Sequence, residues 1–118
     1  MTAAIGRVRM GQILYPRGQG ASTGSVPPGY IEVHRWTDLN EVRMWMDNQG
    51  TTIPARVGAG ERVYVTLPGA PRPPGTGPCR IEFCVPRACL NIAGDPLWRQ
   101  IFQPVQNVPV YNVKIHVP

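Results

Sequence analysis

A short run of polar side chains at the end of one predicted strand is the stretch of this 118-residue sequence with the clearest potential for chemistry. His34, Arg35 and Thr37 differ in hydrogen-bonding type, being an imidazole, a guanidinium fork and a hydroxyl. Strand ends and the loops after them are common places for binding and catalysis. We therefore take this stretch as the first candidate for a ligand site.

The neighbouring residues predict a strand followed by a capped helix. Residues 30–36 are rich in β-branched and aromatic side chains, which favour a half-buried strand. Apolar residues then recur at helical spacing, as a stripe to be buried against a sheet: Leu39, Val42, Trp45 and Met46. Asp38 with Glu41 fits a capping box, and Thr37 is an alternative cap. Gly50 suits the left-handed position that often follows a helix.

The later segments predict three more strands and a second helix. Alternating apolar and polar residues predict strands at 62–67, 80–85 and 108–117. Asp95 followed by Pro96 is typical of a helix start. Apolar residues would form one face of this helix: Leu97, Trp98, Ile101 and Phe102. Strands separated by long loops favour an α+β domain with a mixed sheet over a doubly wound fold.

The composition indicates one domain with long loops. The chain contains 13 Gly and 14 Pro, and residues 1–29 are read as a Gly/Pro-rich segment or linker after a weak strand signal between residues 5 and 15. Residues 30–118 would then form the folded domain. The Pro-rich stretch 68–78 is long enough to be a functional lid or a disordered excursion.

Charge and cysteine content narrow the class of function. The formal charge is +5, and every basic residue except Lys114 is Arg, which suits a phosphate-bearing partner. The Arg residues are scattered, which weakens the case for a nucleic-acid track. The spacing of the three Cys and two His indicates neither a disulfide framework nor a zinc site. No apolar run is long enough to span a bilayer, so membrane insertion is not expected.

Three features in this order resemble the core of the ADP-ribosyltransferase superfamily, in particular its small bacterial toxin-type members. They are residues 33–37 at the end of a strand, a helix ending at Gly50, and Tyr64 with Thr66 on the next strand. The resemblance covers roughly residues 30–117 and implies a split, twisted mixed sheet with short helices. It also implies that NAD is the substrate and that ADP-ribose is transferred to a macromolecule, or that NAD is hydrolysed.

By resemblance, the NAD-binding residues lie on the two strands: His34, Arg35, Trp36, Thr37, Tyr64 and Thr66. His34 would bind the ribose hydroxyls beside nicotinamide with help from Thr37, and Tyr64 would stack on the nicotinamide ring. In a second alignment, Arg35 would hold the NAD phosphates and Thr66 would replace Tyr64 as the site residue. Neighbouring residues of a strand point to opposite faces, so the two alignments make opposite demands on His34 and Arg35. The first alignment, with His34, is preferred, because the sequence around Tyr64 lacks the doubled Ser or Thr of the other branch.

The third catalytic position departs from the family pattern. Members of the family normally carry Glu near the start of a late strand, where it offsets developing positive charge. Residues 103–108 contain no acid here, and Gln106 stands as the candidate for that position. The alternatives are that Glu61 or Glu82 reaches the site, or that the chain is an inactive relative.

The resemblance also implies a biological setting. The domain would be the toxin part of a secreted bacterial effector that acts in the cytoplasm of a target cell and is neutralised by an immunity protein. Two alternatives stay open. One is a small basic ribonuclease-like toxin with His34 and His116 as acid and base. The other is a binding module without enzymatic activity. Taken alone, His116 is expected to be exposed on the polar face of the last strand.

Overall fold

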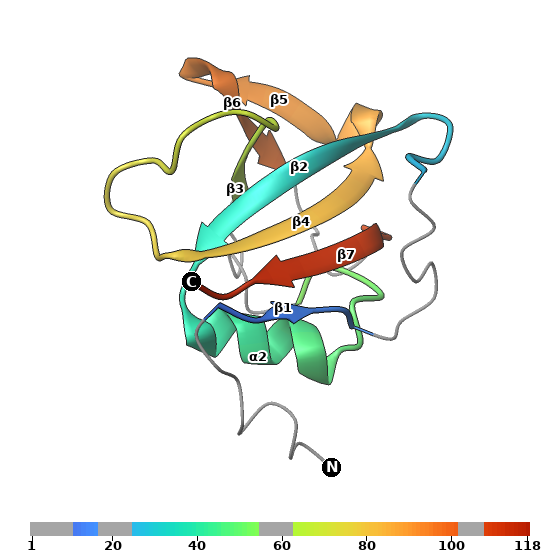
Figure 1. The fold of residues 1–118 in the computed structure, drawn as a ribbon. Helices are drawn as coiled ribbons and strands as arrows, with labels where there is room; N and C mark the ends of the chain where they lie inside the picture. Colours follow the sequence, from blue (N-terminus) through green and yellow to red (C-terminus); the bar gives the residue numbers. More distant parts are fainter. Residues whose placement is uncertain (1–10, 17–24, 55–62, 102–107) are drawn as a thin grey trace.

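The computed structural model describes residues 11–16, 25–54, 63–101 and 108–118. Its helices and strands follow one another along the chain as shown in Figure 1. In order they are β1 (Ile13–Leu14), β2 (Tyr30–Thr37), α2 (Leu39–Asp47), β3 (Val63–Thr66), β4 (Cys79–Pro86), the 3₁₀ turn η1 (Arg87–Cys89), β5 (Leu90–Ala93), β6 (Asp95–Ile101) and β7 (Tyr111–His116).

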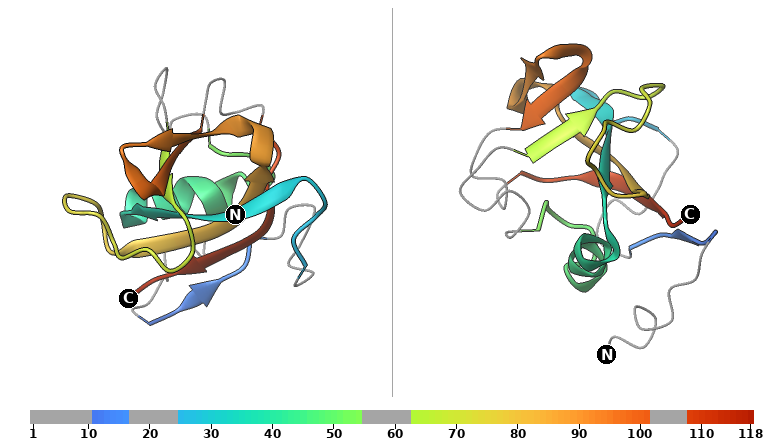
Figure 2. Two further views of the ribbon diagram at one scale, coloured as in Figure 1. Left: turned by 90° about the horizontal axis from the view of Figure 1, so that it is seen from above. Right: turned by 90° about the vertical axis from the view of Figure 1, so that its left-hand side faces the viewer.

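The described strands form one sheet in the order β1-β7-β4-β2-β3-β6-β5. Every pairing between these strands is antiparallel, so the predicted mixed sheet is wrong, although the predicted α+β class is confirmed. Figure 2 shows the predicted twist, with the β5–β6 hairpin at one end of the molecule and α2 at the other.

The predicted helix is confirmed, including its cap. The side chain of Asp38 accepts a hydrogen bond from the backbone N–H of Glu41 at 3.1 Å, so Asp38 rather than Thr37 is the N-cap. Gly50 has a φ of 65°, the left-handed conformation expected there. Leu39, predicted to belong to the buried stripe, is 38% exposed.

The core lies between α2 and the inner face of the sheet. Val42 and Trp45 are fully buried, and the Trp45 ring packs 4.8 Å from that of Phe83 on β4, centroid to centroid. Alternate residues of the neighbouring strands complete this core: Val33, Ile81, Val85, Val113 and Ile115. The other face of the two strands carries Glu32, His34 and Glu82, whereas Arg35 and Thr37 lie on the same face of β2 as Val33.

The predicted second helix is wrong, because residues 95–101 form β6. This strand pairs with β3 on one side and with β5, which the sequence pattern missed, on the other. Gly94 has a φ of 95° and makes the tight turn between β5 and β6, and Asp95 caps the backbone N–H of Leu97 rather than a helix. Leu97 is 41% exposed whereas Ile101 is fully buried, so the residues of the predicted apolar face do not share one environment.

The sheet includes part of the segment before residue 30. Ile13 pairs with His116 and Leu14 with Ile115, which makes β1 an edge strand. The rest of the weak strand signal, before residue 11, lies outside the described residues. Within the described part of the chain, no helix has the length and apolarity needed to cross a membrane.

Candidate functional site

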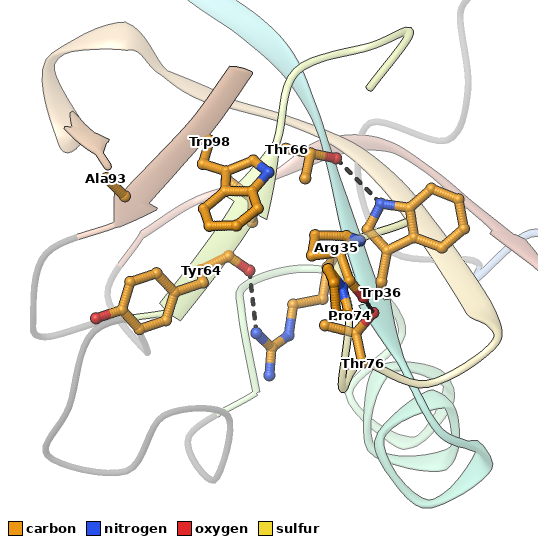
Figure 3. Close-up of a pocket in the computed structure, with 10 residues that line it drawn as sticks. Arg35, Trp36, Tyr64, Thr66, Pro74, Thr76, Ala93 and Trp98 are labelled. Atoms are coloured by element: carbon orange, nitrogen blue, oxygen red, sulfur yellow. Dashed lines mark hydrogen bonds between the residues drawn. The ribbon is translucent and has the colours of Figure 1, made fainter. Parts of the chain in front are cut away.

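A crevice opens where β2 and β3 separate. Among the described residues, the register between these strands includes a single pair, His34 with Thr66. Beyond it, two side chains of β2 reach across to β3 (Figure 3). Arg35 Nη1 donates to the backbone oxygen of Tyr64 at 3.0 Å, and Trp36 Nε1 donates to Thr66 Oγ1 at 3.1 Å. These bonds take the place of a backbone ladder and hold the two strands at a defined separation.

The β2–β3 crevice has a volume of about 350 Å³. Its lining, most of which Figure 3 labels, is largely aromatic and apolar: Arg35, Trp36, Tyr64, Val65, Thr66, Pro73, Pro74, Thr76, Ala93 and Trp98. Small-molecule sites are typically about 300–1,000 Å³ and combine an apolar lining with a few placed polar groups. Tyr64, which is 55% exposed, is a large aromatic surface with little else covering it. The crevice therefore has the volume and the mainly apolar lining of a small-molecule site.

Arg35 is held in place by a buried carboxylate. Its Nε lies 2.9 Å from Glu41 Oε2 and its Nη2 lies 3.0 Å from Glu41 Oε1, a two-pronged pair. Glu41 also accepts from Thr37 Oγ1 at 2.8 Å and from Trp45 Nε1 at 3.3 Å. The Glu41 carboxylate thus accepts hydrogen bonds from these three side chains. A capping box would require it to accept from the backbone N–H of the N-cap residue instead. Because Glu41 offsets its charge, Arg35 offers the crevice directed N–H groups rather than a net positive charge.

A second, more polar pocket adjoins the crevice and shares three lining residues with it, namely Arg35, Trp36 and Thr76. The rest of its lining comes from the start of α2 and the loop before β4: Thr37, Asp38, Gly75 and Gly77. This loop approaches β2 closely, since a Cβ atom at Gly77 would overlap the carbonyl group of Thr37. Asp38 is exposed, and it is the one carboxylate in the described linings of the two pockets.

Most of the residues predicted to bind NAD lie around these two pockets. Trp36, Tyr64 and Thr66 line the crevice together with Arg35, and Thr37 lines the polar pocket. Tyr64 and Thr66 both line the crevice, so the second strand does not distinguish the two alignments. Gln106, the predicted third catalytic residue, lies outside the described residues, and so does Glu61.

His34 lies elsewhere, in a group of charged side chains that we call the His34 cluster: Glu32, His34, Arg80, Glu82 and His116. The Nε2 of His34 lies 2.8 Å from Glu32 Oε2 and 3.9 Å from Glu82 Oε2. Its side chain is only 9% exposed. Of the two first-strand alternatives, Arg35 therefore lines the crevice, and His34 is absent from the described linings of both pockets.

The prediction that His116 is merely exposed is wrong. Its Nε2 lies 2.9 Å from Glu82 Oε2, because Arg80 and His116 are register partners on β4 and β7 and Glu82 is two residues along. Burial holds the pKa of His116 below its ordinary value, and the nearby charge of Glu82 acts in the opposite direction. The two histidines that the sequence places about eighty positions apart thus face the same carboxylate oxygen.

Several site residues were missed by the sequence interpretation. Trp98 was assigned to a helix core, but it lies on β6 opposite Thr66 and forms a crevice wall. Glu41 was read only as a capping residue. Its position six residues after Arg35 gave no signal of their contact, because the chain turns between a strand and a helix there. Pro73, Pro74 and Thr76 border the crevice and belong to the loop for which the sequence leaves open a functional lid or a disordered excursion.

Comparisons with models of protein families, with curated proteins and with solved structures find no match for this chain, so its function has to be inferred from the site itself.

Proposed function

We propose that the chain binds NAD in the β2–β3 crevice and transfers its ADP-ribose to a macromolecule, or to water. The observation that carries this proposal is the crevice itself, in which Arg35 and Trp36 of one strand face Tyr64 and Thr66 of the next across an aromatic gap. These four residues are among those that the resemblance to ADP-ribosyltransferases implies for NAD binding, whereas His34, the preferred residue of the first strand, is absent from the described linings.

The two adjoining pockets match the two chemical parts of such a ligand. The nicotinamide ring would lie in the β2–β3 crevice against Tyr64, since offset aromatic stacking suits a flat ring. The ribose and phosphates would lie in the polar pocket beside the backbone around Gly77. The hydroxyls of Thr37 and Thr76 donate to Glu41 and to the Pro73 carbonyl, so their oxygens are left to accept hydrogen bonds from the ribose hydroxyls. Arg35 lines both pockets and would donate hydrogen bonds where the two parts of the ligand meet.

The chemistry requires one bond to break and one to form at the same carbon. The bond between the ribose C1′ and the nicotinamide nitrogen breaks, and its electron pair leaves with nicotinamide. The acceptor oxygen or nitrogen then bonds to C1′ and loses its proton. Positive charge develops on the ribose in between, and a carboxylate nearby stabilises it. In our proposal Asp38 supplies this charge, because no other carboxylate is found among the described residues that line the two pockets.

The test is release of nicotinamide from NAD by the purified protein, with and without a bacterial lysate as acceptor. Release that depends on the lysate supports a transferase, and release without it supports an NAD glycohydrolase. Absence of release in both, together with absence of an NAD-induced shift in melting temperature, would overturn the proposal.

The setting we propose is that of a secreted effector acting in the cytoplasm of a competing cell. A toxin of this kind needs a protector in the cell that makes it, so the partner would be an immunity protein that covers the crevice. Expression of the chain in a bacterium, with wild-type and Arg35→Met forms compared, tests toxicity directly. Equal growth of both cultures would count against this setting.

The ribonuclease-like alternative has one observation in its favour, the shared contact of His34 and His116 with Glu82. General acid–base catalysis uses such pairs. Against it, the side chains of His34 and Glu82 are only 9% and 17% exposed, which leaves a phosphodiester little access to them. Incubation of the same protein with a short RNA, with EDTA present, tests this alternative beside the NAD assay.

A further inference from the structure

We propose that the His34 cluster is a binding site for a divalent transition-metal ion of the zinc class. The donor atoms of Glu32, His34 and Glu82 all lie within 4.8 Å of one another. They come from two adjacent strands that are paired along their whole length, so the backbone beneath them is rigid. This inference does not depend on NAD binding, because none of these residues is among the described linings of the two pockets.

The spacing suits an ion with bonds of about 2.0–2.2 Å, whose tetrahedral ligands lie about 3.3 Å apart. The separation from His34 Nε2 is 2.8 Å to Glu32 Oε2 and 3.9 Å to Glu82 Oε2. Each distance therefore has to change by less than about 1 Å, which rotation of the two glutamate side chains can supply. The hydrogen bond between His34 and Glu32 would be replaced by bonds from both to the ion.

His116 would be a further ligand beside the group of three. Its Nε2 atom lies 2.9 Å from Glu82 Oε2, in an ion-pair contact that lacks the geometry of a well-formed hydrogen bond. A nitrogen placed in this way can turn to an ion bound at Glu82 without losing a well-formed hydrogen bond. A metal ion beside Glu82 would give this nitrogen a bond and would tie β7 to β2 and β4.

The donor set selects the class of ion. Two imidazoles and two carboxylates suit Zn²⁺ and its neighbours in the first transition row, whereas Mg²⁺ and Ca²⁺ prefer oxygen ligands alone. The burial of His34 and Glu82 admits an ion more readily than a larger ligand. Arg80 is the competitor, since its Nη2 lies 2.9 Å from Glu82 Oε2. Its guanidinium also lies 5.7 Å from the centre of the Trp36 ring, so Arg80 keeps one partner when it leaves Glu82.

The experiment uses Co²⁺ as a visible probe of the intact protein after treatment with EDTA, followed by displacement with Zn²⁺. One equivalent of Co²⁺ should give the visible absorption of a four-coordinate nitrogen and oxygen site. Glu32→Gln should weaken binding at least about tenfold, because it removes a ligand and not merely a supporting group. The side chain of Glu32 is 40% exposed, so this variant is expected to fold. Asp47→Asn, an exposed acid on α2, is the control and should bind as the wild type does.

Arg80→Met separates a metal site from a plain salt-bridge network. Removal of the competing cation should tighten Co²⁺ binding if the carboxylates are ligands. Three results would overturn the proposal: no visible band at millimolar Co²⁺, equal affinity in Glu32→Gln and Asp47→Asn, or a thiolate charge-transfer band showing that cysteines bind the ion instead.

Discussion

Arg35 and Glu41 meet in a two-pronged ion pair, with nitrogen–oxygen distances of 2.9 and 3.0 Å, at the point where β2 passes into α2. The side chains of Arg35 and Glu41 are 21% and 9% exposed, so the pair is largely removed from water. Such a pair is costly to break, because the remaining charge stays buried without a partner. It also sets the direction in which the guanidinium faces the β2–β3 crevice.

Glu41→Gln should therefore lower the free energy of unfolding by about 3 kcal/mol, as measured by urea denaturation. The amide keeps the shape of the side chain but leaves the guanidinium without a counter-charge. Arg43→Gln, at an exposed position of the same helix, is the control and should change stability by less than about 0.5 kcal/mol. The double variant Arg35→Met with Glu41→Gln should lose less unfolding free energy than the sum of the losses in the two single variants. A loss equal to that sum would mean that the two residues are not coupled.

Tyr64→Ala should weaken NAD binding about fivefold without loss of stability. An aromatic stacking contact contributes about 1 kcal/mol, and the side chain is 55% exposed and packs against little else. Calorimetric titration with NAD measures the affinity. Tyr15→Ala removes a similarly exposed tyrosine, which is absent from the described linings of both pockets, and should leave the affinity unchanged. Equal affinity in Tyr64→Ala and the wild type would remove Tyr64 from the site.

Asp38→Asn separates the structural role of this residue from its charge. Asn caps a helix about as well as Asp, so the hydrogen bond to the Glu41 N–H is kept and the unfolding free energy should change little. Loss of the charge should reduce nicotinamide release about tenfold if the carboxylate stabilises the developing cation. Asp47→Asn is the matched control on the far end of α2. Unaltered turnover in Asp38→Asn would mean that the stabilising charge comes from elsewhere.

The strand and helix that carry Arg35 could be predicted because local rules agree there. The β-branched residues of β2, the Asp38 cap, the spacing of Val42 and Trp45 and the glycine at position 50 all point to the same local structure. The residues after Asp95 show the opposite case. A cap-and-proline signal favoured a helix, but two neighbouring strands offer hydrogen bonds on both sides, and tertiary pairing overrides such a weak local preference.

The candidate site was predictable only in part, for a related reason. Tyr64 and Arg35 were identified from short motifs, but their partners Trp98 and Glu41 depend on how β2, β3 and β6 lie side by side. The His34 cluster depends on the registers of β4 with β2 and with β7, which bring Glu82 between two histidines. The local spacing of residues does not determine which residues of two strands pair with each other. Contacts that depend on strand register therefore cannot be predicted without the structure.

Gly77→Ala should disturb the polar pocket. A methyl group there would overlap the carbonyl of Thr37, and backbone atoms cannot move aside as a flexible side chain can. The loop before β4 would have to shift away from β2, at a cost of about 1–3 kcal/mol in unfolding free energy. Because the loop lines both pockets, Gly77→Ala should weaken NAD binding, whereas the control Tyr15→Ala should leave it unchanged. Unchanged stability and affinity would show that this close approach is dispensable.

Cys79, the register partner of Thr37, should make stability depend on alkaline pH. Burial, and secondarily the charge of Asp38, raises the pKa of its thiol, so the folded state favours the neutral form. The resulting stabilisation is complete below the unfolded pKa, near 8.5, and is lost as the pH rises through the higher folded value.

The check is urea denaturation of the wild type and Cys79→Ala at pH 7.5 and 9.5. The wild type should lose more stability between the two pH values than the variant does, because the other titrating groups are common to both proteins. Alkylation by iodoacetamide should agree, with Cys89, which is half-buried, reacting before Cys79. An equal loss of stability in both proteins, or faster alkylation of Cys79, would show that its thiol is not protected by the fold.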